Sequence, residues 1–334
     1  MKILYLYRNP TMGYSIGKVF APIERLMVDY AEVDSFSMPA FGYSVKSLWQ
    51  NISAVRKKVA SQNYDVIHIT GQENYLIPFL DKSKLVVTVH DLDSILSSEH
   101  GFTGIIKHLC FINTLSSAKY LTCISEKSKV EVMKECSVEP KRIHVISNCV
   151  DPAFTYSSKE FNKDCPILLH IGVNPNKNLK RTIEALQGIK CHLRIIGPKK
   201  DVDYELLNDS GIEYSIVSNL TDDEIIQEYQ KCDIVNFPSL YEGFGMPIIE
   251  GQAIGRVVVT SNISPMKEVA GDGAILVDPM DMTSIHNGYI EAINNSHHYI
   301  QRGLENVKRF EISKIVRKYL DLYQDIYIST HSKE

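Results

Sequence analysis

Residues 234–255 read IVNFPSLYEGFGMPIIEGQAIG, which has the form of a strand, a loop and a helix. The run from Ile234 to Phe237 is mainly apolar and predicts a buried strand, and Pro247 suits the first turn of the helix that follows. Gly243 and Gly245 lack side chains, so backbone N–H groups there can approach a ligand closely. Free amides at a helix N-terminus attract anions. We therefore expect a site for an anion, above all phosphate, at this turn.

Two carboxylates accompany the turn, because Glu242 lies in the loop and Glu250 is predicted in the first turn of the helix. A carboxylate one turn into the helix can accept hydrogen bonds from a diol such as a ribose. An anion site beside a diol site suits a sugar nucleotide. The same pattern also fits an ordinary strand-to-helix turn in which an acidic residue interacts favourably with the helix dipole.

The spacing of these carboxylates resembles a known signature. Glu242 and Glu250 enclose seven residues, and the stretch resembles the E-x7-E motif of the retaining glycosyltransferases of family 4. The similarity continues at Ser261-Asn262, Pro265, Glu268-Val269 and residues 271–279. The resemblance implies an α/β chain of GT-B fold, with two doubly wound Rossmann-like domains facing a central cleft. It also implies metal-independent transfer of a hexose, with retained configuration, from a nucleoside diphosphate sugar to an acceptor hydroxyl.

The family pattern implies roles for individual residues. Glu242 would contact the hexose, and Lys177, which precedes Asn178 as in the family, would hold the diphosphate. His90 directly follows the apolar strand residues Val86 to Val89 and resembles the family histidine that contacts the donor hexose. The remaining donor-binding positions on this pattern are Glu250, Gly243, Phe244, Gly245, Met246, Gly13, Gly17, Gly172, Asn174, Gly197 and Leu220. No covalent nucleophile or cofactor is expected, and the sugar nucleotide is a substrate.

The length, composition and net charge are those of an ordinary globular protein. Its 334 residues are enough for two domains, 44% are hydrophobic, and the net charge is −4, which gives no basic excess for nucleic acid. Seven cysteines without a C-x-x-C pair argue against a disulfide framework or a zinc site. No run approaches the roughly 20 apolar residues of a membrane span, and Met1-Lys2 leads straight into strand residues. We expect a cytoplasmic location.

Strands and helices alternate twice along the chain, with a polar linker near residues 157–166. The predicted strands are 2–7, 65–70, 85–89, 120–124, 143–146, 167–172, 192–197, 215–220, 234–237 and 257–260. We predict a first, acceptor-binding domain over 1–158 and a second, nucleotide-sugar-binding domain over 159–311. A C-terminal helix over 312–334 is expected to cross back to the first domain. Open parallel sheets bind ligands at the carboxyl ends of their strands, so His90 and residues 71–74 lie where chemistry is expected.

Three segments of the first half allow two interpretations. Gly13 and Gly17 in the loop over residues 9–17 can approach a phosphate or can simply form a turn. Asp91-Leu-Asp93 spells a metal-binding D-x-D, but a loop cap fits the metal-independent architecture better. Residues 44–62 predict an amphipathic helix whose apolar stripe, with Val45 and Trp49, either packs in the core or contacts an anionic membrane surface on the cytoplasmic side.

The chain departs from the family pattern at several positions. The arginine that in the family usually accompanies the lysine at the position of Lys177 is absent near Val173. Cys149 stands where the family has a turn glycine, and Ser15 stands where a loop glycine is common. Arg256 and Val257 stand where Thr-Pro is common. These departures keep a non-catalytic, nucleotide-binding partner subunit open as an alternative. A sugar-nucleotide epimerase or a phosphorylase explains the Glu242 to Glu250 run less well. A dinucleotide-dependent oxidoreductase is disfavoured because no G-x-G-x-x-G follows either first strand. A bacterial surface glycan or a lipid-linked intermediate is the expected acceptor.

Overall fold

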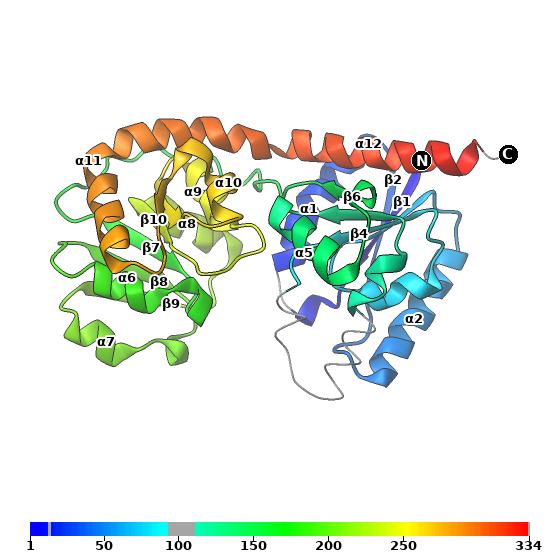
Figure 1. Ribbon diagram of the computed structural model, residues 1–334, viewed down its shortest axis with the longest axis horizontal. Helices are drawn as coiled ribbons and strands as arrows, with labels where there is room; N and C mark the ends of the chain where they lie inside the picture. The colour runs from blue at the N-terminus through cyan, green and yellow to red at the C-terminus, as the bar shows by residue number, and fades with distance from the viewer. Residues whose placement is uncertain (13–14, 93–110, 333–334) are drawn as a thin grey trace. The chain divides into compact units, whose positions relative to one another are not determined.

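The computed structural model describes residues 1–12, 15–92 and 111–332 and divides the chain into two compact units (Figure 1). One unit is Met1–Cys149 together with Ile312–Glu334, and the other is Val150–Glu311. The predicted domain boundary at residues 158 and 159 lies nine residues beyond the boundary between these units. Gly13, Asp93 and residues 94–110 lie outside the described residues.

The first unit is built on a six-stranded parallel sheet with strand order β2-β1-β3-β4-β5-β6. Its strands are β1 (Lys2–Tyr7), β2 (Glu32–Ser37), β3 (Val66–Ile69), β4 (Leu85–Val89), β5 (Tyr120–Cys123) and β6 (Ile143–Val145). The central strands β3 and β4 are buried at every position, as expected of a parallel sheet covered on both faces. The helices are η1 (Pro10–Met12), α1 (Ser15–Met27), α2 (Val45–Ala60), η2 (Asn74–Phe79), η4 (Leu115–Ser117), α5 (Glu126–Cys136), η5 (Pro140–Arg142) and α12 (Ile312–His331).

The second unit repeats this architecture with strand order β12-β11-β10-β7-β8-β9. Its strands are β7 (Ile167–Ile171), β8 (His192–Ile196), β9 (Glu213–Val217), β10 (Ile234–Phe237), β11 (Val257–Ser261) and β12 (Ile275–Val277). Its helices are η6 (Pro175–Lys177), α6 (Leu179–Ala185), η7 (Lys199–Asp201), α7 (Tyr204–Asp209), α8 (Asp222–Lys231), α9 (Met246–Ile254), α10 (Met266–Ala270), η8 (Gly271–Gly273), α11 (Met282–Asn306) and η9 (Val307–Phe310). Two six-stranded parallel sheets confirm the predicted α/β fold of two Rossmann-like domains.

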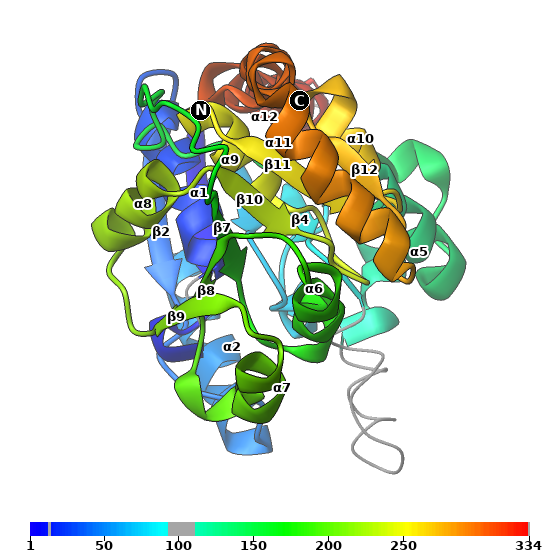
Figure 2. The same cartoon turned by 90° about the vertical axis from the view of Figure 1, so that its left-hand side faces the viewer.

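The second sheet is covered by helices on both faces, with α8 on one side and α6 and α11 on the other (Figure 2). Leu168, Ile234 and Val257 pack against α6 and α11 in one apolar core. The predicted strand over 215–220 is wrong at both ends, because β9 covers Glu213–Val217 and Leu220 lies in the following loop. Asn219 there has a positive φ of 57°, which a strand cannot accommodate.

The linker at residues 157–166 is fixed to the second unit by two buried charges. The Arg256 guanidinium donates to the Ser157 carbonyl at 2.9 Å and to the Gln230 carbonyl at 2.8 Å. The Asp233 carboxylate pairs with Lys159 and accepts the Ile167 N–H at 2.8 Å. Arg256 therefore has a structural task at the position where the family often shows Thr-Pro.

The C-terminal helix α12 belongs to the core of the first unit. Tyr319 and Tyr323 of α12 are buried, and the Tyr323 hydroxyl lies 2.5 Å from Nδ1 of His68 on β3. Nε2 of His68 is hydrogen-bonded to Thr88 Oγ1 on β4 at 2.7 Å. Burial lowers the pKa of His68 to about 3, so the imidazole is neutral in the folded protein.

This buried histidine makes stability depend on pH. Because the folded pKa is depressed to about 3, the unfolded chain binds the proton first, and the free energy of unfolding falls as the pH drops below about 6.5. The loss is about 2 kcal/mol between pH 7 and pH 5 and continues toward pH 3. Urea unfolding at pH 7 and pH 5 measures it.

His68→Asn should remove the part of that pH dependence that His68 contributes, about 2 kcal/mol between pH 7 and pH 5, and should leave the part that His170 contributes. His297→Asn is the control, because His297 is exposed. His170 in the second unit has a similarly low pKa of about 3, so the comparison of variant with wild type isolates His68. An unchanged pH dependence in His68→Asn would contradict the assignment.

Candidate functional site

The turn between β10 and α9 has the predicted form. β10 ends at Phe237 and α9 begins at Met246, so Pro247 stands in its first turn, where no N–H partner is needed. Gly245 caps the helix with a positive φ of 111°, and a Cβ there would lie 2.9 Å from Cδ1 of Ile248. Glycine is therefore required at this position, and the amides around it are at the positive end of the helix.

The prediction that Glu250 lies in the first helical turn is wrong. Glu250 is the fifth residue of α9, and no acidic residue occupies the first turn. The reason is that the helix starts at Met246, before Pro247, whereas the sequence interpretation began it at the proline. A direct interaction of Glu250 with the helix dipole is correspondingly weaker, because that effect falls off within the first turn.

The central feature of the site is an ion pair between Lys177 and Glu242. The Lys177 Nζ lies 2.5 Å from Glu242 Oε1, and the two side chains are 22% and 15% exposed. The same ammonium lies 5.0 Å from the centroid of the Phe237 ring, which adds a cation–π contact. The structure thus brings together two residues that stand far apart in the sequence and that were both predicted to bind the donor.

The loop after β7 positions Lys177. Gly172 has a positive φ of 90°, and a Cβ there would lie 2.9 Å from Cγ of Lys177. Asn178 Nδ2 donates to the carbonyls of Pro238 at 3.0 Å and Pro279 at 2.7 Å. The backbone N–H of Leu240 donates to the Asn176 carbonyl at 2.8 Å. These bonds join the Lys177 loop to the Glu242 loop, so the two charges are held in register by the backbone.

A polar network is buried in the core of the second unit. Asn236 Nδ2 lies 2.9 Å from Nδ1 of His170 on β7, and Tyr289 on α11 donates to Asn236 Oδ1 at 2.8 Å. Burial, and then the Lys177 ammonium, lower the pKa of His170 to about 3. His170 is therefore neutral and adds no second positive charge near the ion pair.

Tyr229 is a partner of Glu250 that the sequence interpretation missed. The hydroxyl of Tyr229, in α8, donates to Glu250 Oε2. Burial and the Glu250 charge hold the pKa of Tyr229 far above its usual range, so the phenol stays protonated. A tyrosine in an amphipathic helix ordinarily indicates core packing, so the sequence carried no signal for this contact.

Several other predicted donor-binding residues follow strands of the same unit. Gly197 follows β8, and a Cβ there would lie 2.7 Å from Cγ1 of Val173. The Asn174 carbonyl accepts the Lys177 N–H at 2.8 Å. Gly243 is half-buried in the loop before α9, and Leu220 is half-buried in the loop after β9. The Phe244 ring is buried edge-on against Phe310, so the side chain is not available to a ligand and only the backbone of Phe244 could bind one.

His90 lies at the end of β4 in the first unit and is 8% exposed. Its Nε2 lies 2.8 Å from the Thr70 carbonyl, so Nε2 carries the proton and Nδ1 is an acceptor. Burial lowers the pKa of His90, which favours this neutral form.

Gly17 does not lie in a loop as predicted, because α1 already begins at Ser15. Cys149 is buried without a positive φ, so its turn differs from a glycine turn.

Two sequence models cover most of the chain. The model described as Glycosyltransferase Family 4 matches residues 18–154, and the one described as Glycosyl transferases group 1 matches residues 155–308. With the two parallel sheets, these matches define a glycosyltransferase of GT-B fold. The chain belongs to glycosyltransferase family 4, as the E-x7-E resemblance implied.

Relatives and solved structures agree with this assignment. O-antigen chain mannosyltransferase B of Escherichia coli is 24% identical over 299 residues, which cover 80% of this chain and 77% of that protein. Sucrose-phosphate synthase of Thermosynechococcus elongatus has a TM-score of 0.80 at 16% identity, covering 98% of this chain and 100% of that one. HepE of Anabaena, solved with UDP and glucose, has a TM-score of 0.74 at 16% identity, covering 97% and 99%. At these identities the solved structures show the fold alone.

Glycine at position 172 should be required for the placement of Lys177. Gly172→Ala combines a strained positive φ, which costs about 1–2 kcal/mol, with a collision against the Lys177 side chain. Gly188→Ala is a matched control, because Gly188 has a φ of 82° but nothing within 4 Å of its Cβ. Thermal or urea unfolding should show a larger loss of stability for Gly172→Ala.

The additional loss of stability of Gly172→Ala relative to Gly188→Ala should disappear when Lys177 has been replaced by alanine. In a Lys177→Ala background, Gly172→Ala is expected to cost about as much as Gly188→Ala, within about 0.5 kcal/mol. Equal losses for the two glycine variants in the wild-type background would show that Lys177 does not depend on Gly172.

Proposed function

We propose that the protein transfers a hexose, with retained anomeric configuration, from a UDP- or GDP-linked sugar to a hydroxyl of a glycan or lipid-linked acceptor. The observation that carries this proposal is the Lys177–Glu242 pair of 2.5 Å beside the N-terminus of α9, with Glu250 in the next helical turn. A cation, backbone amides and two carboxylates in one unit match the diphosphate, the ribose and the hexose of such a donor.

The ion pair is exchanged when the donor binds. The diphosphate takes over the Lys177 ammonium and accepts hydrogen bonds from the amides of Phe244, Gly245 and Met246. Glu242 is thereby released to accept hydrogen bonds from hydroxyls of the hexose. Negative charge grows on the diphosphate as the glycosidic bond breaks, and prearranged donors stabilise that charge most where it develops. The positive charge for this step comes from Lys177 and the helix, so the proposed reaction uses no metal or cofactor.

Retention follows from attack on the same face that the diphosphate leaves. The acceptor hydroxyl forms the new C1–O bond as the old one breaks, and a diphosphate oxygen takes its proton. Neutral His90, with an acceptor Nδ1, receives a hydrogen bond from a substrate hydroxyl. Holding both substrates in one geometry supplies several kcal/mol of the barrier reduction.

The relatives named above guide the choice of the donor substrates to test first. A relative named as an O-antigen chain mannosyltransferase supports a mannose donor and a role in bacterial surface polysaccharide synthesis. The neighbour solved with UDP and glucose supports a UDP-linked sugar as the second choice. We therefore select GDP-mannose and UDP-glucose as the leading pair.

Isothermal titration with GDP and UDP, followed by turnover of the matching sugar nucleotides, tests the proposal. Lys177→Ala should weaken the nucleotide about tenfold or more, since a charge-assisted contact contributes about 1.5–3 kcal/mol. Glu242→Gln should bind nucleotide nearly as wild type but lose about a hundredfold in turnover. Lys180→Ala is the control, because Lys180 is an exposed lysine of α6.

NMR of the product anomer distinguishes retention from inversion, and inversion would overturn the stereochemical part. Nucleotide binding with neither transfer nor donor hydrolysis would favour a non-catalytic partner subunit. An epimerase would change the sugar without releasing the nucleoside diphosphate. Failure to bind either nucleotide would remove the basis of the proposal.

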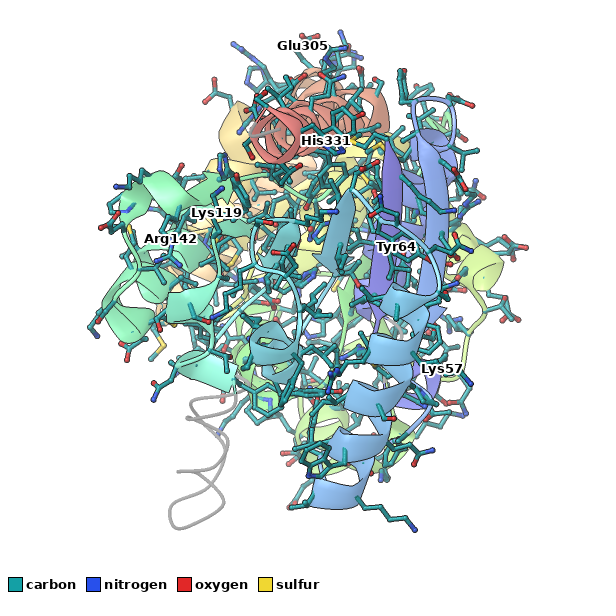
Figure 3. The ribbon with its side chains drawn as sticks, turned by 90° about the vertical axis from the view of Figure 1, so that its right-hand side faces the viewer. Lys57, Tyr64, Lys119, Arg142, Glu305 and His331 are labelled. Carbon is teal, nitrogen blue, oxygen red and sulfur yellow. The ribbon has the colours of Figure 1, made fainter. Side chains whose placement is uncertain are left out.

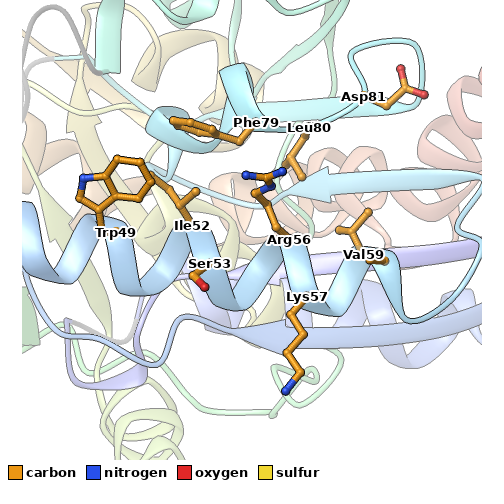
Figure 4. Close-up of a pocket in the computed structure, with 10 residues that line it drawn as sticks. Trp49, Ile52, Ser53, Arg56, Lys57, Val59, Phe79, Leu80 and Asp81 are labelled. Carbon is orange, nitrogen blue, oxygen red and sulfur yellow. The ribbon is translucent and has the colours of Figure 1, made fainter.

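The surface formed by α2 and η2 supports peripheral contact with a membrane. The interpretation that the apolar stripe of this helix packs in the core holds for Ile52 and Val55, which are buried. It fails for Val45 and Trp49, which are 71% and 62% exposed, and Phe79 beside Trp49 is 41% exposed. Figure 4 shows Trp49, Ile52 and Arg56 pointing toward Phe79 and Leu80 in a pocket between α2 and η2. Lys57 is also among the lining residues, but its side chain extends toward the other side of α2 in this view. Lys57 is also labelled on α2 in Figure 3. Among the described helices, none has the length and apolar character to cross a bilayer.

We infer that exposed aromatic rings and basic side chains of α2 bind an anionic lipid surface. Trp49 is the only tryptophan, so its fluorescence should shift to the blue with phosphatidylglycerol vesicles but not with phosphatidylcholine vesicles. High salt should weaken the shift.

Arg56→Glu should reduce vesicle binding severalfold, because Arg56 is exposed on the same side of α2 as Trp49 and each basic residue near the surface contributes about 1 kcal/mol. Lys134→Glu, a charge reversal at an 80% exposed lysine of α5, is the control. Equal binding by both variants, or equal shifts with both lipids, would refute membrane contact through α2.

A further inference from the structure

We propose that Tyr229 is a positioning residue for donor binding, whose hydroxyl orients the Glu250 carboxylate toward the ribose hydroxyls of the nucleotide. This inference rests on the proposed function, because it takes Glu250 as the ribose-binding residue. The Tyr229 hydroxyl donates directly to Glu250 Oε2. Tyr229 itself is fully buried, whereas Glu250 is half-buried and accessible to a ligand.

Tyr229 is held rigidly in its own surroundings. Its ring packs edge-on against Phe154, with centroids 5.4 Å apart and planes at 85°. Its backbone carbonyl accepts the Arg256 Nε–H at 3.1 Å, and Arg256 is itself held by further carbonyls. The Tyr229 hydroxyl is therefore a donor in a fixed position, and its hydrogen bond restricts the position of the Glu250 carboxylate.

The hydrogen bond lowers the entropic cost of using a glutamate to bind ribose. The carboxylate sits at the end of a side chain with several rotatable bonds, and ordering it on binding costs conformational entropy. A hydrogen bond that orders Glu250 before the nucleotide arrives removes part of that cost. Each carboxylate oxygen offers two acceptor sites, so Oε2 can accept from Tyr229 and still accept from a ribose hydroxyl.

The distinguishing consequence is that Tyr229 matters only when the ribose has hydroxyls to offer. Tyr229→Phe keeps the ring and its packing but removes the donor. We expect it to weaken the nucleotide that the wild type binds, GDP or UDP, about five- to tenfold. The 2′,3′-dideoxy form of the same nucleotide should bind wild type and Tyr229→Phe equally. Isothermal titration of the full chain measures all four dissociation constants.

Tyr299→Phe is the matched control, because Tyr299 also donates to a glutamate of the second unit, Glu291, at 3.2 Å. This control should leave both dissociation constants unchanged. Glu250→Gln supplies a second variant: adding Tyr229→Phe to it should weaken the ribonucleotide less than in the wild-type background. If Tyr229→Phe weakens both nucleotides equally, or weakens neither, the positioning role is overturned.

Failure of the underlying assignment would look different. Wild type should bind the ribonucleotide more tightly than its dideoxy form, and Glu250→Ala should abolish that difference. If Glu250→Ala leaves the difference intact, Glu250 is not the ribose ligand, and both the assignment and the role of Tyr229 are overturned. If Glu250→Ala abolishes it but Tyr229→Phe does not reduce it, the positioning role alone is overturned.

Discussion

The salt bridge between Lys177 and Glu242 is the interaction on which the candidate site depends. A half-buried lysine and glutamate are expensive to desolvate, and their mutual attraction compensates only with good geometry and support. The support comes from backbone: glycine at 172 makes room for the lysine, and Asn176 and Asn178 tie the two loops together. The pair keeps both charges in place, and in the proposed reaction the diphosphate replaces Glu242 as the partner of Lys177 while Glu242 accepts hydrogen bonds from hexose hydroxyls.

Much of the fold could be predicted because its signals are local. The predicted strands at 2–7, 85–89 and 234–237 match the structure at both ends. The capping box of Thr221 and Glu224 likewise marks the start of α8. The strand Glu32–Ser37 was missed because only one of its six residues, Phe36, is a large aromatic, and half of the strand is exposed at the edge of its sheet. A weakly apolar edge strand gives almost no periodic signal.

The site was predictable in part for a similar reason. Lys177, Glu242 and Glu250 belong to motifs with fixed spacing, so their identities could be read from the sequence. Their partners depend on tertiary packing, which spacing does not encode. Tyr229 reaches Glu250 from a neighbouring helix, and Val45 and Trp49 face outward although the helical period fits a buried stripe. The helical period predicts which side of the helix is apolar, as the buried Ile52 and Val55 show, but not how much of that side meets protein and how much meets solvent or lipid.

The way the first unit is assembled from both ends of the chain has a consequence for synthesis on the ribosome. Residues 150–311 form a continuous unit and can fold once they have emerged. Tyr5 and His68 pack against Tyr319 and Tyr323 of α12, which is synthesised later. Until α12 has been synthesised, the face of the early strands that it covers stays unprotected. Nascent chains with this order of assembly expose apolar surface for longer, which is the condition under which chaperones are needed.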